Sequence, residues 1–250
     1  MMYNMEKTEV IIKIEKLHKQ FGTNVVLNGF DLELHKGENL VVMGKSGSGK
    51  SVMIKCIIGL EDYQGGSIKV ADKEISELDR KELDELRTDI GFLFQGSALY
   101  DSMSVRENLE FPLRRHPKKI GKLDDTTPLI LEALESVGLA HAIDLMPNEL
   151  SGGMKRRIAL ARTLILKPTI ILYDEPTTGL DPITSKEIIL LMQSIQKKYN
   201  TSSIIITHDV DCAKAIANRM ILLIDGKNYA EGTFESLQAA TDPKIKAFFK

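Results

Sequence analysis

The chain has 250 residues, 43% of them hydrophobic and 27% charged, and its net charge is -2. This composition is that of an ordinary globular protein, which excludes a disordered or fibrous chain. A nearly neutral charge lacks the basic footprint that follows a nucleic-acid backbone, so we expect no nucleic acid as a partner. The length suits one domain with one hydrophobic core, and two independent domains are not expected.

The two cysteines and the amino terminus exclude further classes of protein. Cys56 and Cys212 lie far apart within apolar helical patterns, which excludes a disulfide scaffold and offers no metal-ligand spacing. Residues 1–8 lack the apolar stretch of a signal peptide, and no run reaches the roughly 18 apolar residues of a membrane-spanning helix. We therefore expect a cytosolic protein that reaches any membrane through a partner.

The first predicted elements are a small sheet and a strand that leads into a loop and a helix. Residues 10–14 and 30–34 have the pattern of short strands, the second alternating like a half-buried antiparallel strand. Residues 39–43 form a buried strand, followed by a glycine-rich loop at 44–49 and a helix at 50–58. The sequence thus predicts strand, loop and helix in direct succession.

The rest of the chain alternates strands and helices, except in its middle. Buried strands are predicted at 90–94, 169–173, 202–207 and 220–224, with helices such as 183–198 between several of them. This alternation predicts a parallel sheet covered by helices on both faces. From about residue 96 to residue 166 only helical patterns occur, at 105–113, 128–137 and 153–166. They predict a helical subdomain inserted into the α/β core.

A phosphate-binding loop is the most specific motif of the sequence. Residues 44–51, GKSGSGKS, fit the pattern G-x-x-x-x-G-K-[ST] between a buried strand and a helix. Its backbone amides can wrap the phosphates of a nucleotide, Lys50 can bring a charge to the β and γ oxygens, and the Ser51 hydroxyl can ligate Mg²⁺. The residues expected to bind the nucleotide here are Gly44, Lys45, Ser46, Gly47, Ser48, Gly49, Lys50 and Ser51.

Two carboxylates end a predicted central strand. Residues 170–173 are apolar and are followed by Asp174 and Glu175. Ligands bind at the carboxyl ends of strands in open α/β sheets, so Asp174 can hold Mg²⁺ through water and Glu175 can orient or deprotonate the attacking water. By itself the pair would be a polar strand end, but beside a phosphate loop that interpretation is the weaker one.

A serine and two glycines precede the predicted helix at 153–166. Alone, Ser151, Gly152 and Gly153 would be an ordinary turn with a helix cap. A hydroxyl with free amides at a helix N-terminus is also a second anion site, aimed by the helix dipole. One chain does not need two phosphate sites unless two chains share each nucleotide.

Together, these motifs resemble an ABC transporter ATPase in order and approximate spacing, over nearly the whole chain. The resemblance is carried by the loop 44–51, Gln95, residues 150–153, Asp174 with Glu175, residues 179–181 and His208. It implies a P-loop NTPase with a RecA-like parallel sheet core, a small antiparallel β subdomain and an inserted helical subdomain. It further implies one ATP-binding domain at residues 8–241, with the helical subdomain at about 96–166 and a short tail at 242–250.

The same resemblance implies roles for single residues. Phe21 would stack on adenine, and Gln95 would sense Mg²⁺ and the permease. Residues 151–153 would contact the γ-phosphate held by the opposite subunit of an ATP-sandwich homodimer, across which Asp181 would communicate. His208 would contact the γ-phosphate, and its place after a predicted strand supports this independently. The implied cofactors are ATP and Mg²⁺, with Ser51, Gln95 and Asp174 as metal ligands and Lys50, Glu175 and His208 as catalytic groups.

A finer resemblance lies in residues 93–116, 145–154 and 242–248, which look like the ATPases of the Mla or MCE-associated lipid-asymmetry transporters. Met154 departs from the glutamine usual in ABC signatures, and this subgroup tends to share the change. The resemblance implies a motor for phospholipid transport at the cytoplasmic face of the bacterial inner membrane. Its implied partners are permease subunits and an MCE-type lipid-binding subunit.

An apolar group follows Gln95, where the family receives a short cytoplasmic helix from its permease. These side chains are Leu99, Tyr100, Met103 and Phe111. They either pack the helical subdomain or form a socket that the permease covers.

Rival interpretations remain for a chain with these motifs. A DNA-repair ATPase with the same head needs a long coiled coil between Ser51 and Leu150, where sustained heptads are absent. A translation ATPase generally carries two such cassettes, and a non-catalytic scaffold would not need the complete set of catalytic side chains. Among transporters, a small-solute importer or a lipoprotein releaser is the alternative.

Overall fold

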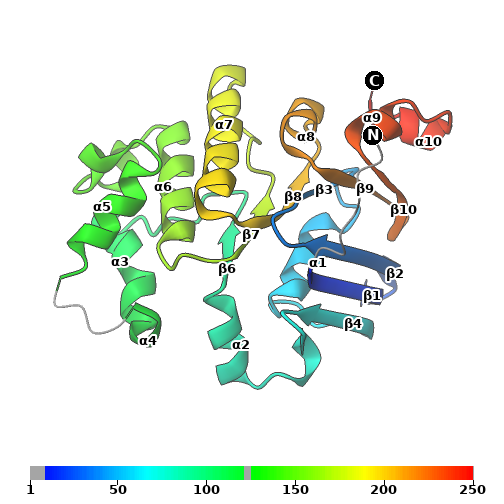
Figure 1. Ribbon diagram of the computed structural model, residues 1–250, viewed down its shortest axis with the longest axis horizontal. Helices are drawn as coiled ribbons and strands as arrows, with labels where there is room; N and C mark the ends of the chain where they lie inside the picture. The colour runs from blue at the N-terminus through cyan, green and yellow to red at the C-terminus, as the bar shows by residue number, and fades with distance from the viewer. Residues whose placement is uncertain (1–8, 121–124, 250) are drawn as a thin grey trace. The chain divides into compact units, whose positions relative to one another are not determined.

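The structure is a computed structural model that describes residues 9–120 and 125–249. The chain divides into two compact units (Figure 1). Residues 1–84 and 202–250 belong to the first unit, and residues 85–201 belong to the second. Among the described residues, no helix is both long and apolar enough to cross a membrane.

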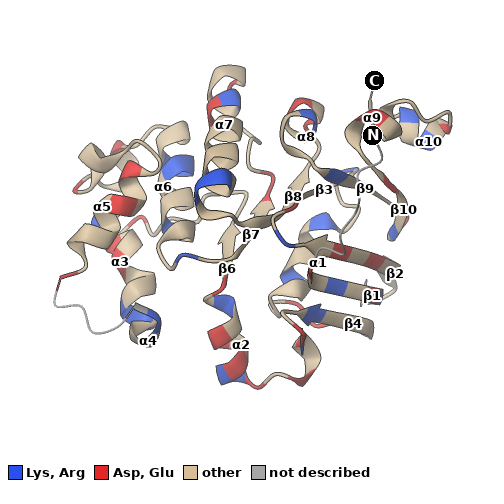
Figure 2. Cartoon of the chain, in the orientation of Figure 1, with Lys and Arg blue, Asp and Glu red and all other residues tan. Residues whose placement is uncertain are grey.

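The first unit contains an antiparallel sheet in the order β2-β1-β4-β5. Its strands are β1 (Val10–Phe21), β2 (Asn24–His35), β4 (Gly65–Val70) and β5 (Lys73–Glu74). The strands expected at 10–14 and 30–34 are therefore parts of a longer hairpin. Apolar side chains on one face of these strands are buried, while Lys, Asp and Glu alternate with them on the other face (Figure 2).

The phosphate-loop strand lies in the second sheet of this unit, whose order is β10-β9-β3-β8. Strands β3 (Asn39–Gly44), β8 (Ser202–Thr207) and β9 (Arg219–Ile224) are parallel, and β10 (Lys227–Gly232) pairs with β9 antiparallel. Strand β10 was not among the strands expected from the sequence, and it adds an antiparallel edge to the parallel strands. Every residue of β3 and β8 is buried, as in a central strand covered on both faces.

Short helices pack on these sheets. They are α1 (Lys50–Ile57), α8 (Val210–Ile216), α9 (Phe234–Gln238) and α10 (Pro243–Lys246), while α2 (Arg80–Arg87) leads into the second unit. Figure 1 shows α1 between β3 and the antiparallel strands, and it contacts both β3 and β4. Cys56 on α1 is buried, and burial raises the pKa of its thiol to about 11, so it behaves as an unreactive apolar side chain.

The end of the chain packs on the first unit. The Tyr229 hydroxyl donates to the Asp242 carboxylate at 2.7 Å, and the Asp242 side chain caps α10. The rings of Phe234 and Phe249 meet edge to face at 5.4 Å, and Ile245 is buried. The described part of the tail therefore folds against its own chain.

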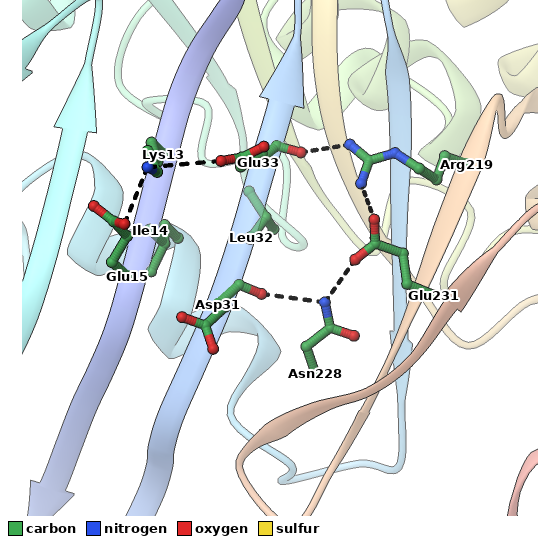
Figure 3. A pocket seen from close by; sticks show the side chains of 9 residues that line it. All are labelled: Lys13, Ile14, Glu15, Asp31, Leu32, Glu33, Arg219, Asn228 and Glu231. Atoms are coloured by element: carbon green, nitrogen blue, oxygen red, sulfur yellow. Dashed lines mark hydrogen bonds and ion pairs between the residues drawn. The ribbon is translucent and has the colours of Figure 1, made fainter.

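A pocket of about 290 Å³ lies between the β1–β2 hairpin and strands β9 and β10 (Figure 3). Arg219 donates to the Glu33 carbonyl at 2.5 Å and also pairs with Glu231 and Glu38. Lys13 pairs with Glu15 at 3.0 Å. The Asn228 side chain also donates to the Asp31 carbonyl at 3.3 Å, so hydrogen bonds from Arg219 and Asn228 join the second sheet to the hairpin across this pocket.

The second unit contains a pair of parallel strands and a group of helices. Strands β6 (Ile90–Leu93) and β7 (Ile170–Asp174) pair from Ile90 with Ile170 to Leu93 with Tyr173. Its helices are α3 (Val105–Arg115), α4 (Pro117–Ile120), α5 (Thr127–Glu135), α6 (Gly152–Leu164) and α7 (Pro182–Tyr199). Helix α6 is central, since it contacts β6, α3, α5 and α7. The helices expected at 105–113, 128–137 and 153–166 are present as α3, α5 and α6.

Candidate nucleotide site

The phosphate loop leaves the end of β3 and turns into α1. Gly49 precedes the helix with a φ of 101°, in the left-handed region that favours glycine. A Cβ at Gly49 would lie 2.7 Å from Val26 Cγ1 and 3.0 Å from the Val26 carbonyl oxygen. Glycine is therefore required both by the turn and by close packing of the loop on β2.

Two polar groups of the loop are suited to phosphate. The buried Lys50 ammonium donates to the carbonyl oxygens of Gly44 at 2.8 Å and Lys45 at 3.1 Å, so the charge is held inside the loop. The buried Ser48 hydroxyl has no hydrogen-bond partner among the described residues. A buried hydroxyl without a partner is costly, and a phosphate oxygen would satisfy it. The loop thus fits the phosphates of a nucleotide.

His208 lies at the same sheet edge as the phosphate loop. Strands β3 and β8 are parallel neighbours, with Met43 opposite Thr207, so Gly44 and His208 leave the sheet side by side. Asp209 then caps α8, accepting from the amides of Asp211 at 2.9 Å and Cys212 at 3.1 Å. This cap turns the chain at His208, whose side chain is exposed.

Phe21 belongs to the same unit and ends β1. It pairs with Asn24 across the hairpin turn, two residues before the Val26 on which Gly49 packs. Phe21 is 46% exposed, so it does not pack in the core. The hairpin end thus presents an open aromatic face next to the phosphate loop.

The two carboxylates lie in the second unit, at the end of β7. Asp174 and Glu175 are both buried, and the Thr178 hydroxyl donates to Glu175 Oε2 at 3.1 Å. Glu175 has a φ of 51°, a left-handed conformation that is strained for a residue with a side chain. Such strain clusters at functional sites, where the surrounding structure holds the residue in place.

Gln95 lies at the same edge of the β6–β7 pair. Leu93 is opposite Tyr173, so the exposed Gln95, two residues beyond Leu93, follows β6 where Asp174 and Glu175 end β7. The second unit therefore brings together the three side chains predicted from its two strands.

Arg156 is a site residue that the sequence interpretation passed over. It is buried on α6, and its guanidinium donates to the carbonyl oxygens of Phe94 at 2.8 Å and Thr178 at 3.4 Å. Burial lowers the pKa of Arg156, and the Asp174 carboxylate opposes that shift. Arg156 thus links the segment before Gln95 with the turn after Glu175. The sequence feature that could have identified Arg156 is its place on the apolar face of α6, beside two other basic residues.

The Ser-Gly-Gly turn packs on the segment that contains Asp181. Ser151 caps α6 by accepting from the Met154 amide at 3.2 Å. A Cβ at Gly153 would lie 2.7 Å from Thr184 Cγ2, and the Thr184 hydroxyl donates to Asp181 at 2.5 Å. Asp181 also caps α7. The Ser-Gly-Gly turn and Asp181 are therefore linked through Thr184, and Ser151 and Gly152 are exposed.

The metal ligands predicted from the sequence do not form a complete metal site made of protein side chains alone. Among the described residues, no group of three or more His, Cys, Asp or Glu side chains could hold a metal ion. Mg²⁺ usually keeps several waters and binds through substrate phosphates and one or two protein groups. The hydroxyl of Ser51, directly after the phosphate loop, and the lone carboxylate of Asp174 suit that kind of ligation.

The second unit has a pocket of about 180 Å³, and none of the four apolar side chains after Gln95 lines it. Tyr100 and Phe111 are exposed, and their ring centroids lie 5.2 Å apart. Phe94, Pro112 and Arg162 line the pocket beside them, and Arg162 lies 5.8 Å from the Tyr100 ring. Leu99 and Met103 are half-buried.

The loop that presents Tyr100 is held by a residue that carried no signal in the sequence. The buried Asn108 side chain accepts from the Tyr100 amide at 2.8 Å. It also donates to the carbonyl oxygens of Tyr100 at 3.1 Å and Met103 at 3.0 Å. Asn108 therefore fixes the backbone beneath the exposed ring.

Comparisons with known proteins bear on this site. A family model described as ABC transporter matches residues 27–178. The chain is 40% identical to the methionine import ATP-binding protein MetN of Campylobacter jejuni, over 95% of this chain and 75% of that protein. It is 38% identical to the intermembrane phospholipid transport system ATP-binding protein MlaF of Haemophilus influenzae, over 96% of this chain and 90% of that protein.

A solved structure shares the fold. The dimeric post-hydrolysis state of the ATP-binding cassette MJ0796, bound to ADP and Pi, has a TM-score of 0.80 and 32% sequence identity to this chain. The similarity covers 89% of this chain and 98% of that one. The predicted P-loop NTPase α/β fold is therefore confirmed.

Proposed function

We propose that this chain, which belongs to the ABC transporter family and hydrolyses ATP, powers phospholipid transport between the inner and outer membranes of a bacterium. The observation that carries the lipid assignment is the resemblance of residues 93–116, 145–154 and 242–248 to the Mla or MCE-associated ATPases, including Met154 in the signature turn. The 38% identity to MlaF, over 90% of that protein, supports it.

In the proposed reaction the protein positions groups and neutralises charge during phosphoryl transfer to water. The loop at residues 44–51 binds the phosphates, and the buried Lys50 and the partnerless Ser48 hydroxyl support this assignment. Ser51, Gln95 and Asp174 would hold Mg²⁺, which would supply further positive charge to the phosphates. Glu175 orients or deprotonates the attacking water, and its burial at a strained strand end favours that role.

Further roles are proposed for the residues around this core. Phe21 stacks on adenine, and its exposed ring near the phosphate loop supports this. His208 contacts the γ-phosphate from the strand end next to that loop. Residues 151–153 contact the γ-phosphate of a second copy of the chain, and Asp181, packed below that turn through Thr184, communicates across the dimer. The dimeric cassette of similar fold supports a pair of chains.

The proposed membrane partner is a permease that covers Tyr100 and Phe111. Exposed aromatic side chains favour an interface, and Asn108 holds the backbone of Tyr100 in place without the partner. An MCE-type lipid-binding subunit would belong to the same complex. The chain would then work at the cytoplasmic face of the bacterial inner membrane.

Methionine import is the second candidate function. The 40% identity to MetN is as high as the identity to MlaF, so the catalytic site alone does not separate the two. The ATPase contacts nucleotide and permease rather than cargo, so the substrate must be identified from the complex.

The deciding experiment is purification of the tagged protein from its native membranes in mild detergent, with mass spectrometry of the accompanying proteins and lipids. We expect a permease and an MCE-type protein with bound phospholipid. A complex with a permease whose ATP hydrolysis is stimulated by a methionine-loaded binding protein would instead establish the second candidate.

A matched pair of variants tests the docking surface in the same purification. Tyr100→Ala with Phe111→Ala should lose the permease, whereas Tyr229→Ala removes an equally exposed ring from the first unit and should keep it. Retention of the permease by the Tyr100 and Phe111 variant would refute this docking site.

A further inference from the structure

We propose that Lys19 is a positioning residue for the base of the bound nucleotide, acting through the ring of Phe21. This inference rests on the proposed adenine-binding role of Phe21. The Lys19 ammonium lies over that ring, 4.4 Å from its centroid. Lys19 and Phe21 are two residues apart on β1, so their side chains leave the strand on the same face.

Lys19 is fixed by contacts on its other side. Its side chain is 6% exposed, although lysine is rarely buried. The ammonium donates to the Asp62 carbonyl oxygen at 2.5 Å and pairs with the Glu61 carboxylate at 3.3 Å. The buried Lys19 ammonium is thus held in one position by two oxygens. Because the ring of Phe21 packs against it, that position also determines where the ring lies.

Through its contacts, Lys19 connects the ring of Phe21, on which the base is proposed to stack, to the phosphate loop. Glu61 and Asp62 follow α1, and the Glu61 amide bonds to the Lys55 carbonyl at 3.3 Å in the last turn of that helix. The same helix begins at Lys50, which belongs to the phosphate loop. Lys19 therefore ties the ring of Phe21 to the helix that holds the loop, so that the binding groups for base and phosphates are set by one rigid element.

Lys19 also acts on the ring electrostatically. A cation on one face of a benzene ring attracts its π electrons, and the effect is larger where water is excluded. The ring keeps a large exposed surface on which a purine can stack. Lys19 thus orders and polarises the ring without occupying the place of the base.

Removal of the Lys19 side chain should leave the β1–β2 hairpin folded, because other hydrogen bonds hold it in place. The Gln64 amide donates to the His18 carbonyl at 2.9 Å, and the Gln20 amide donates to the Gln64 side chain at 2.8 Å. These bonds join β1 to the segment after α1 without using the ammonium. A loss of binding in Lys19→Met would therefore report on the ring rather than on strand pairing.

The test compares ADP with pyrophosphate by titration calorimetry on the full chain, since pyrophosphate shares the phosphates but has no base. Lys19→Met should weaken ADP binding about threefold to tenfold, the range expected for a desolvated cation–π contact. Pyrophosphate binding should stay within twofold of wild type. Lys19→Arg should restore ADP binding, and in the Phe21→Ala background Lys19→Met should add no further loss.

Lys16→Met is the matched control, because it removes the same charge from the same strand at an exposed position. It should bind ADP like wild type. Unchanged ADP binding by Lys19→Met, or an equal loss for pyrophosphate, would overturn the role of Lys19 while Phe21→Ala still weakens ADP binding. If Phe21→Ala itself binds ADP normally, the proposed base platform fails and this inference fails with it.

Discussion

Glu175 combines burial, a left-handed backbone and a hydrogen bond accepted from the Thr178 hydroxyl. Glu175→Gln keeps the shape and can still accept that bond, but an amide cannot take a proton from water. We predict that ATP still binds while hydrolysis falls at least about 100-fold, as for loss of a general base. Glu187→Gln, at an exposed ion pair with Arg157, is the control. Normal hydrolysis by Glu175→Gln would refute the assignment.

Asp181 allows a test at the residue scale that depends on pH. The Thr184 hydroxyl and nearby amides hold the pKa of Asp181 below its ordinary value. Because the folded pKa is below the unfolded one, this stabilisation is present above the unfolded pKa, about 3.9, and is lost as pH falls through the folded pKa. Thr184→Val keeps the methyl that meets Gly153 but removes the donor.

We predict that Thr184→Val raises the pKa of Asp181 toward its ordinary value, so that the stabilisation from ionised Asp181 becomes smaller and less of it is lost as the pH falls. Carboxyl NMR titration measures the shift, and Thr184→Ser, which keeps the hydroxyl, is the control. An unchanged titration in Thr184→Val would show that the amides alone set the pKa.

At the scale of elements, α6 carries the Ser-Gly-Gly turn at its start and Arg156 in its first turns. Arg156→Met fills a similar space but removes the guanidinium that donates to the carbonyl oxygens of Phe94 and Thr178, of which the Phe94 oxygen still accepts from the Ser97 amide. We predict a loss of about 1–3 kcal/mol in the free energy of unfolding, the range for lost hydrogen bonds from a charged donor, measured by urea denaturation.

The kcat of Arg156→Met tests whether Arg156 links the segment before Gln95 to the turn after Glu175. Phe94 precedes Gln95, and Thr178 donates to Glu175, so we expect kcat to fall about tenfold or more in Arg156→Met. Arg157→Met removes a partly exposed ion pair and should cost less than about 1 kcal/mol with kcat preserved. Equal effects of the two substitutions would contradict the special place of Arg156.

At the scale of the whole molecule, the proposed sandwich requires a second chain. Glu175→Gln with ATP should elute as a dimer in size-exclusion chromatography with light scattering, because bound ATP joins two chains and is not consumed. The nucleotide-free variant should remain monomeric. The double variant with Lys50→Ala, which removes the buried ammonium of the phosphate loop, should not dimerise when ATP is added. A dimer that is independent of ATP would contradict the proposed sandwich.

Much of this molecule was predictable because its signals are local. The phosphate loop is a contiguous string between a buried strand and a helix, and both flanking elements lie where expected, as β3 and α1. The helices α3, α5 and α6 follow from apolar periodicity. Strand β10 was missed because its residues are mostly polar and alternate only weakly with apolar ones. The hairpin turn before it, formed by Asp225 and Gly226 with positive φ, could have indicated it.

The sequence by itself therefore determined the family, the fold class and the candidate residues for binding and hydrolysis, because each depends on residue types at fixed short spacings. Only the tertiary structure decided which groups meet across the chain. Arg156 on two distant carbonyls, Asn108 beneath Tyr100 and Lys19 against Asp62 are such cases. Periodicity indicates that a side chain is buried, but the partner of a buried polar group is set by packing between elements, which no local pattern encodes.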